Sequence, residues 1–480
     1  MSDESALLEL SLCEAADKVR AGEVTSSELV RAALRRAAAV QPGTNCFLAI
    51  EAEEALAAAA RADAAVQRGE KLGLLHGVPL AHKDMFYREG RVTTGGSRLL
   101  SDFLPDTTAT VVQRLDAAGA IWLGRLNMSE FAANPTGQND SFGDCRNAWN
   151  PARISGGSSS GSGVAVASRA CFGSLGSDTG GSVRLPAALN GVVGLRPTYG
   201  RVSRHGILPR TWSMDTVGPL ARTARDCARL LAVIAGGDAN DASCSSMDVP
   251  QYEQELTGDI AGLRIAVAAN YFSDDVTPDV RAAMAASLQV LADQGAEIVE
   301  VSMPDPERLY HLGNLISQVE AAAIHSELLR KHGDDYPLVL RTRMASGFYV
   351  PAVDYLAALS ARARLATEFV EAVFARADVL YTPTIGMPAP TFESITARSS
   401  ADVFPILART ARNTRPFSTI GMPAISVPAG FCREGLPVAF QLVGRPFAEG
   451  LLLRVADAYQ RATDWHRRVP PEAIEPARKL

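Results

Sequence analysis

Two hydrophobic periods alternate along the chain, one of helical spacing and one typical of buried strands. Because the two types succeed one another, the pattern favours an α/β sheet over an all-α or all-β fold. Helical spacing predicts helices over residues 11–20, 26–39, 51–68, 107–118, 223–235, 278–294 and 448–462. Short apolar runs predict strands over residues 77–81, 120–126, 263–268, 296–301, 379–383, 424–428 and 438–443.

The chain shows no internal repeat and no stretch typical of a linker, so we expect one large domain over residues 1–480. Residues 1–70 are predicted to form a helical N-terminal segment. Residues 305–375 are mostly helical in pattern and are predicted to form a cap-like insertion on one side of the site.

A stretch rich in glycine and serine, residues 154–197, interrupts this alternation. Eleven of the 39 glycines lie between Gly156 and Gly200, in two clusters that flank the apolar segment 164–170. A flexible linker is polar throughout, whereas this apolar segment can pack as a helix or a strand and hold the clusters together. Glycine lets backbone N–H groups approach a ligand closely, and a row of such groups can bind an oxyanion. The stretch therefore predicts a catalytic centre.

Lys83 is unusual because the chain has only five lysines among its 47 basic residues. It follows directly on the apolar strand predicted at 77–81. A desolvated lysine can lose its proton and act as a base, which arginine cannot do. A structural role, pairing with Asp84 or protecting an edge strand, explains the position equally well.

The serines of the first cluster also have two interpretations. Most serines in such loops cap helices or bond to the backbone. The pentapeptide at 157–161, GSSSG, matches the nucleophile elbow of serine hydrolases and would make Ser159 the nucleophile. The base would then be one of the histidines downstream, which are His205, His311, His325, His332 and His466. No Gly-Lys-Ser/Thr ends the cluster, which argues against a phosphate-binding loop.

Composition and charge limit the remaining classes. A net charge of −6 gives no electrostatic reason to expect nucleic acid or an anionic membrane as a partner. Seven cysteines without a C-x-x-C spacing predict neither a disulfide framework nor a zinc site. No signal peptide and no 18-residue apolar run are visible, so we expect a cytoplasmic enzyme. We expect no metal or other cofactor, small molecules and water as its only partners, and a monomer or homodimer.

Several motifs together resemble the amidase signature family. They are VPLAHKD around Lys83, GGSSSGSG at 156–163, and GSDTGGSVRLPAALNGVVGLRPTYGRVSR from Gly176 to Arg204. Further similarity lies at 123–132, 212–223 and 378–384 and in the GMPAISVPAGF and GLPVAFQLVGRPF segments. The resemblance implies an α/β fold with a central twisted mixed sheet covered by helices on both faces.

The resemblance also implies a catalytic triad of Ser182 as nucleophile, Ser158 after a cis peptide bond as bridge, and Lys83 as base. Such a relay would deprotonate the attacking hydroxyl and protonate the leaving nitrogen, as other Ser-Lys hydrolases do. It further implies an oxyanion hole and an ion pair that braces its loop. These roles are expected of the backbone N–H groups of Thr179, Gly180, Gly181 and Ser182, and of Asp178 with Arg184.

The family contains hydrolases of carboxamides, aryl amides and carbamates, and also the glutaminase subunits of tRNA amidotransferases. In those subunits an acidic residue lies about a dozen residues before the GLP-type turn, where this chain has Ala411 with Arg412 and Arg415 nearby. We therefore expect a hydrolase of carboxamides, with aryl amides or carbamates (urethanes) as further substrates. The alternative is a glutaminase-type subunit. The expected substrate pocket comprises Phe131, Ala132, Ala133 and Asn134, where two alanines leave space or pack on a helix.

Overall fold

A computed structural model describes residues 3–396 and 400–471 and contains two sheets. The larger sheet is mixed: β7 is parallel to β8 and β9, and the other pairs are antiparallel. In spatial order its strands are β4 (Gly173–Asp178), β6 (Thr216–Ala221), β5 (Val193–Arg196), β10 (Ala424–Phe431), β11 (Pro437–Val443), β9 (Val379–Pro383), β7 (Arg264–Ala268) and β8 (Glu297–Val301). A three-stranded sheet has the order β1 (Phe47–Ile50), β3 (Ile121–Leu126) and β2 (Pro79–Lys83).

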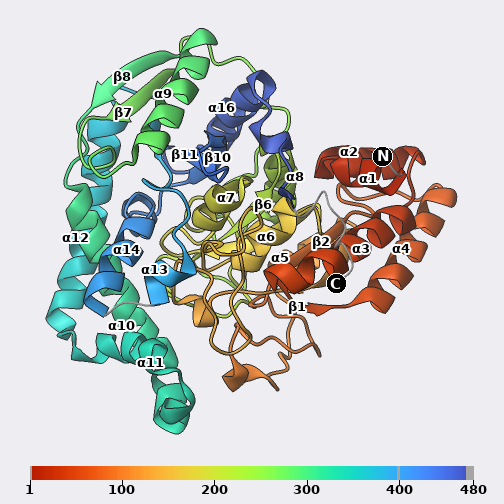
Figure 1. The fold of residues 1–480 in the computed structure, drawn as a ribbon, viewed down its shortest axis with the longest axis horizontal. Coiled ribbons are helices and arrows are strands. Elements are labelled where there is room, and N and C mark those ends of the chain that lie inside the picture. Colours follow the sequence, from red (N-terminus) through yellow and green to blue (C-terminus); the bar gives the residue numbers. More distant parts are fainter. Residues whose placement is uncertain (1–2, 397–399, 472–480) are drawn as a thin grey trace.

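Helices surround these sheets, with β7, β8 and α9 at one end of the molecule and α1 to α4 at the other (Figure 1). Those of the N-terminal half are α1 (Asp3–Glu9), α2 (Leu12–Ala21), α3 (Ser26–Thr44), α4 (Ala52–Gln67), α5 (Thr110–Ala117), α6 (Ser160–Ala167), α7 (Arg184–Asn190) and α8 (Ala224–Ile234). Those that follow are α9 (Pro278–Asp293), α10 (Pro306–His332), α11 (Leu338–Ala345), α12 (Ala352–Phe374), α13 (Phe392–Thr396), α14 (Ser400–Ala411), α15 (Arg415–Thr419) and α16 (Glu449–Ala462). Short 3-10 turns occur at η1 (Arg98–Leu100), η2 (Glu130–Ala132), η3 (Gly333–Asp335), η4 (Ser346–Tyr349) and η5 (Trp465–Arg467).

The large sheet is covered on both faces, which explains why its strands read as continuous apolar runs. Along β9, Val379 and Tyr381 belong to one hydrophobic cluster and Leu380 to another. Successive side chains of a strand point to opposite faces, so the two clusters lie on opposite faces of the sheet. The predicted α/β domain with a mixed sheet and helices on both faces is confirmed.

The N-terminal region departs from an all-helical segment. Strand β1 lies between α3 and α4 and pairs with β3. Its four residues are too few for a clear period, and Asn45 ends α3 in the left-handed conformation just before it. The span predicted as a helical insertion contains α10, α11 and α12.

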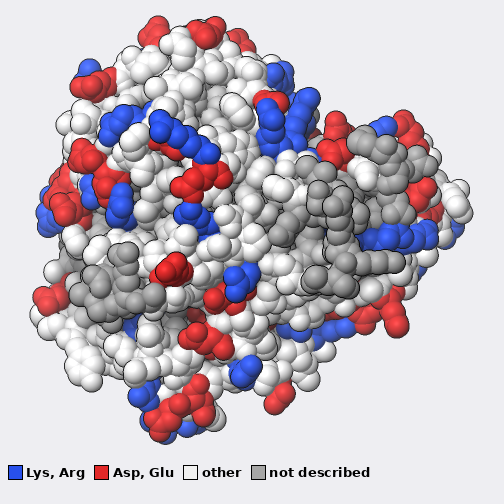
Figure 2. Space-filling model, viewed as in Figure 1, with Lys and Arg blue, Asp and Glu red and all other residues white. Residues whose placement is uncertain are grey.

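Surface charge is mixed in sign on the face shown in Figure 2, where acidic and basic side chains are scattered among uncharged residues and often lie close to each other. The net charge of −6 is therefore not gathered into one acidic patch on this face. No helix among the described residues is long and apolar enough to cross a membrane.

Candidate active site

Lys83 ends strand β2 and is completely buried. Its Nζ donates hydrogen bonds to Ser158 Oγ at 2.6 Å and to Ser177 Oγ at 2.8 Å. Burial lowers the pKa of Lys83 to about 7, against the opposing effect of the Asp215 and Asp178 charges. At neutral pH a large fraction of this lysine is therefore unprotonated and able to accept a proton.

Ser158 is presented to Lys83 by an unusual backbone. The peptide bond from Gly157 to Ser158 is cis, as the family resemblance implied. The Gly157 N–H donates to the carbonyl of Pro135 at 2.7 Å, and a Cβ at this position would lie 2.6 Å from Ser129 Oγ. Only glycine fits there. The Ser129 N–H donates in turn to the Ser158 carbonyl at 3.1 Å, which holds the turn from its other side.

Ser182 lies between β4 and α7, beside the turn that carries Ser158. The Ser159 N–H donates to its carbonyl oxygen at 3.3 Å. Lys83 and Ser158 are completely buried, whereas Ser182 is partly exposed. A nucleophile needs this access, while the two groups predicted to relay its proton are kept away from water.

The loop before Ser182 is held by a buried carboxylate. Asp178 accepts hydrogen bonds from the N–H groups of Gly181 at 2.8 Å and Val183 at 3.3 Å, and from Arg184 at 3.0 and 3.1 Å. Arg196 adds a second ion pair at 3.2 Å. Burial alone would raise the pKa of Asp178, but the charges of Arg184 and Arg196 outweigh it and lower the pKa well below its usual range. Asp178 and Arg184 thus form the ion pair that was predicted.

Two further contacts fix the predicted oxyanion loop. The Thr179 hydroxyl donates to Asp215 Oδ1 at 2.5 Å, and the Thr414 hydroxyl donates to the Gly180 carbonyl at 2.7 Å. Gly181 has a φ of 131°, a conformation that residues with a side chain rarely adopt. Its N–H already serves Asp178. Side-chain hydrogen bonds from Asp178, Asp215 and Thr414 therefore hold this loop.

Ser177 and Asp215 are site residues that sequence reasoning missed. Successive side chains on β4 alternate, so Ser177 reaches Lys83 while Asp178 reaches the arginines. Ser177 directly precedes Asp178 on strand β4, and this position could have indicated its role. The glycines and serines of the strand gave no strand pattern, so β4 was not predicted. Asp215 lies one residue before β6, and the pairing of Thr216 with Asp178 brings it to the loop.

The nucleophile-elbow interpretation of Ser159 finds no geometric support. The Ser159 hydroxyl bonds to the backbone of Ser177, donating to its carbonyl and accepting from its N–H at 3.3 Å each. All seven histidines lie within the described residues, and none hydrogen-bonds to Ser159 or Ser182. The buried His82 accepts the N–H of Leu175, and burial lowers its pKa to about 3.

The segment expected to line the substrate pocket has a strained backbone at η2. Phe131 and Ala132 have φ angles of 48° and 55°, which non-glycine residues seldom adopt. The Phe131 ring is buried against His325, with ring centres 4.6 Å apart. Ala133 packs into a cluster with residues of α10 and α11, so its small size is explained by helix packing. Asn134 accepts hydrogen bonds from Ser129 and Thr136.

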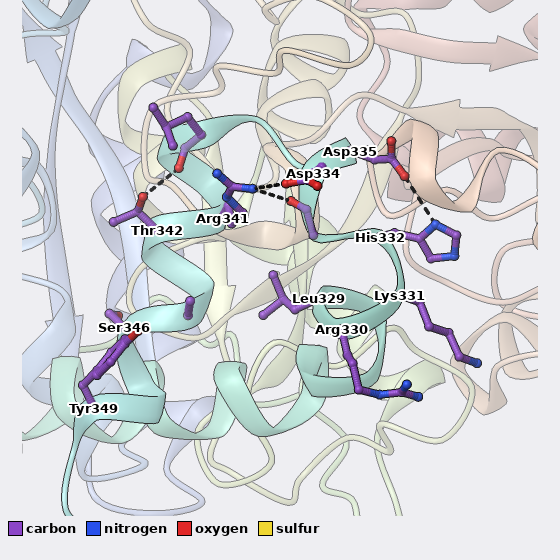
Figure 3. Close-up of a pocket in the computed structure, with 13 residues that line it drawn as sticks. Leu329, Arg330, Lys331, His332, Asp334, Asp335, Arg341, Thr342, Ser346 and Tyr349 are labelled. Carbon is purple, nitrogen blue, oxygen red and sulfur yellow. Dashed lines mark hydrogen bonds and ion pairs between the residues drawn. The ribbon is translucent and has the colours of Figure 1, made fainter.

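Hollows lined by described residues also lie outside the triad, and two of them are considered in turn. One, of about 720 Å³, lies between the end of α10 and α11 (Figure 3). Two pairs of its polar side chains contact each other, Arg341 with Asp334 at 2.7 Å and His332 with Asp335 at 3.3 Å. The other, of about 270 Å³, is lined in part by Trp212 and Asp215. Because Asp215 contacts Thr179, this second hollow reaches a side chain that holds the oxyanion loop.

This fold and geometry are those of the amidase family, to which the chain belongs. The family model described as Amidase matches residues 28–453. The chain is 42% identical to a glutamyl-tRNA(Gln) amidotransferase subunit of Roseiflexus sp. (strain RS-1), over 98% of this chain and 99% of the relative. It is 39% identical to the subunit of the same name from Myxococcus xanthus (strain DK1622), over 97% and 99%. The chain is therefore an enzyme of the class that hydrolyses C–N bonds.

Solved structures give the same family. A protein of a vestigial complex related to an s-triazine catabolic enzyme shares 34% of its sequence with this chain, with a TM-score of 0.88 over 94% of this chain and 98% of that one. The peptide amidase of Stenotrophomonas maltophilia is 29% identical, with a TM-score of 0.83 over 96% and 98%.

The relatives contradict the expected partners and bear on the expected substrate class. Their shared name places them in an amidotransferase of glutamyl-tRNA(Gln), as one of its subunits. The prediction of small molecules as the only partners, with no nucleic acid, is therefore wrong. It failed because the net charge of one chain does not report what the other subunits of an assembly bind. The relatives also favour the glutaminase-type alternative over aryl amides or carbamates.

Proposed function

We propose that the chain hydrolyses a carboxamide through an acyl-enzyme on Ser182. The observation that carries this proposal is the buried contact of 2.6 Å between Lys83 Nζ and Ser158 Oγ, directly beside the partly exposed Ser182. Unprotonated Lys83 takes a proton from Ser158 as Ser158 takes one from Ser182, and Ser182 Oγ attacks the amide carbon.

Collapse of the tetrahedral intermediate breaks the C–N bond. The proton held on Lys83 returns through Ser158 to the leaving nitrogen, which departs as ammonia or an amine. Water then attacks the ester carbon by the same relay and releases the carboxylic acid. The backbone N–H groups of Thr179, Gly180 and Ser182 are proposed to stabilise the oxyanion, because that of the expected fourth donor, Gly181, already donates to Asp178. Each such donor is typically worth about 2.7–4 kcal/mol.

We further propose a glutaminase-type role, in which the amide nitrogen leaves as ammonia for a partner subunit. It is supported by about 40% identity over nearly the whole chain to relatives named as glutamyl-tRNA(Gln) amidotransferase subunits. The packing of Ala133 against α10 and α11 removes the main argument for a bulky aryl pocket. The chain has Ala411 and Arg412 at the position of the acidic residue expected in glutaminase subunits. This difference argues against glutamine as the carboxamide that supplies the ammonia.

The test measures the products released by the purified chain, alone and mixed with the partner subunits of a relative. Glutamine, small carboxamides, p-nitroanilides and aryl carbamates are supplied in turn. Ammonia from carboxamides, lost in Ser182→Ala, supports the proposal. Turnover confined to anilides or carbamates, whether or not partners are present, would reject the glutaminase-type role. Full activity in Ser182→Ala would reject the nucleophile.

A further inference from the structure

Asp215 is a buried carboxylate that is held by hydrogen bonds beside the predicted oxyanion loop. Only 1% of the residue is exposed. Its Oδ1 accepts hydrogen bonds from the hydroxyls of Thr179 at 2.5 Å and Thr211 at 2.9 Å. Its Oδ2 accepts the backbone N–H groups of Arg210 at 2.8 Å and Thr211 at 2.9 Å. These donors use the two oxygens of an ionised carboxylate, which is a pure acceptor.

The negative charge of Asp215 has no direct counter-ion. Among the described residues, no lysine, arginine or histidine side chain forms an ion pair with it. Arg210 approaches with its backbone N–H, whereas its guanidinium donates to the Ser317 carbonyl at 3.4 Å. The neighbouring carboxylate of Asp178 differs, because Arg184 and Arg196 both pair with it. The charge of Asp215 is therefore the less compensated of the two and can act on other groups.

Strand β4 brings Asp215 to the same side of the site as Lys83. Side chains two residues apart on a strand point the same way, and Thr179 follows Ser177 by two residues. Ser177 Oγ accepts a hydrogen bond from Lys83 Nζ at 2.8 Å, while the Thr179 hydroxyl donates to Asp215. Asp215 is the residue before β6, whose pairing with β4 places it opposite the end of that strand.

The charge of Asp215 reaches Lys83 without touching it. Burial lowers the pKa of Lys83 to about 7, and the charge of Asp215 opposes this effect more than that of Asp178 does. The hydrogen bonds of Lys83 Nζ go instead to Ser158 and Ser177. Two arginines also face Asp215: burial lowers the pKa of Arg196 and of Arg210 to about 10, and the charge of Asp215 acts against burial in both.

We propose that Asp215 is a positioning residue that stabilises the protonated form of Lys83 during the reaction. In the proposed mechanism Lys83 holds the proton from the Ser182 hydroxyl while the tetrahedral intermediate exists, so a positive charge forms on a buried nitrogen. A buried ammonium is costly unless an anion lies near it. Asp215 supplies this anion without accepting the proton. The inference rests on the proposed amide hydrolysis and concerns the charge balance within it.

An anion at this distance suits a base that must be neutral before proton transfer and charged after it. A carboxylate in direct contact typically changes the pKa of its partner by about 1–3 units. Such a contact would keep Lys83 protonated at neutral pH and unable to accept a proton. Asp215 lies behind Thr179 and leaves the pKa of Lys83 at about 7.

The kinetic test separates the charge of Asp215 from its hydrogen bond to Thr179. Asp215→Asn keeps the shape and removes the charge, so the acidic limb of the kcat/KM profile should move to lower pH by at least about 0.5 pH unit. Its kcat should fall by about 10-fold, because the ammonium formed on Lys83 is less stable. Thr179→Val removes the hydrogen bond and keeps the charge, so kcat should fall while the limb stays in place.

Asp241→Asn is the matched control. Its carboxylate lines the same hollow and accepts the backbone N–H of Arg204 at 2.8 Å, so the variant should keep the wild-type rate and limb. Asp215→Ser, which leaves room for water from that hollow, repeats the loss of charge with a second side chain. An unshifted limb in both Asp215 variants would overturn the inference even if their rates fall.

A stability measurement tests the same interaction without turnover. Urea unfolding is compared in wild type, Asp215→Asn, Lys83→Met and the double variant. At about pH 6 Lys83 is mostly protonated, so Asp215→Asn should destabilise the protein more in the wild-type background than in the Lys83→Met background. At about pH 9 Lys83 is neutral, and this difference should disappear. Equal destabilisation in both backgrounds at about pH 6 would overturn the inference, whereas the proposed hydrolysis is tested independently by its products.

Discussion

At the scale of single residues, burial lowers the pKa of Lys83 and so determines the pH at which this lysine can act as a base. A base of pKa about 7 is protonated and inactive in acid and becomes unprotonated as the pH rises. We therefore expect kcat/KM to increase from about pH 5.5 to about pH 8 and to reach a plateau above it. Steady-state rates on a carboxamide over this range provide the measurement.

Lys83→Arg separates proton transfer from charge at the same position. Arginine keeps the positive charge and cannot lose its proton, so this variant should be as inactive as Lys83→Ala, with activity lower by several orders of magnitude. A retained rate in Lys83→Arg would show that the residue acts only as a fixed cation. A profile that persists in Lys83→Ala with an apparent pKa of about 6.5 would point instead to a histidine.

Substitution of Ser177 tests whether its hydrogen bond affects the pKa and position of Lys83. Its hydroxyl oxygen accepts a hydrogen bond from Lys83 Nζ at 2.8 Å and so favours the protonated form. Ser177→Ala should move the acidic limb of the pH profile to lower pH and reduce kcat by about 10-fold through looser positioning of Nζ. Ser174→Ala, on the same strand with its hydroxyl directed to a backbone carbonyl, is the control. An unshifted limb in Ser177→Ala would mean that Ser158 alone fixes the lysine.

At the scale of secondary-structure elements, strand β4 organises the site. Its residues GSLGSD deliver Ser177 to Lys83 and Asp178 to Arg184, and its glycines let neighbouring turns approach. Gly176 packs directly on the turn that carries Ser158 and Ser159, which we call the serine turn, since a Cβ on Gly176 would lie 2.5 Å from Ser159 Oγ.

Gly176→Ala should therefore displace the serine turn without touching a predicted triad residue. Overpacking of this kind typically costs about 1–3 kcal/mol of stability, and we expect activity to fall by more than about 10-fold because small shifts of reacting groups are costly. Gly333→Ala, where a Cβ meets nothing within 4 Å, is the matched control. Urea unfolding and steady-state rates measure both effects. Wild-type activity in Gly176→Ala would show that the serine turn tolerates displacement.

The same element shows how far the sequence could predict the fold. Strands with branched apolar residues were located closely, as at β9 and β11. Strand β4 was missed because glycine and serine give no strand signal; its pairing with β6 and its burial determine its conformation. Lys83, Ser158 and Ser182 were predicted from motif resemblance. Asp215 could not be predicted, because only the pairing of β6 with β4 brings it to the loop before Ser182.

At the scale of the whole molecule, the buried lysine should affect stability as well as rate. In the unfolded chain Lys83 has a pKa of about 10.4, whereas burial lowers it to about 7 in the folded protein. Between these values the unfolded state binds more protons, so the free energy of unfolding increases with pH. Below about pH 7 both states are protonated and the folded state carries the full cost of a buried charge.

Lys83→Met removes the titrating group, so the pH dependence of its stability should be weaker than that of wild type. From about pH 7 to about pH 9 the free energy of unfolding of wild type should gain about 2 kcal/mol relative to Lys83→Met, because one proton is worth about 1.36 kcal/mol per pH unit. Urea unfolding at both pH values measures the difference, in which other titrating groups cancel. Lys331→Met, at an exposed lysine paired with Glu327, should keep the wild-type dependence. Equal dependence in wild type and Lys83→Met would mean that Lys83 keeps its proton throughout this range, and the proposed relay would then lack its base.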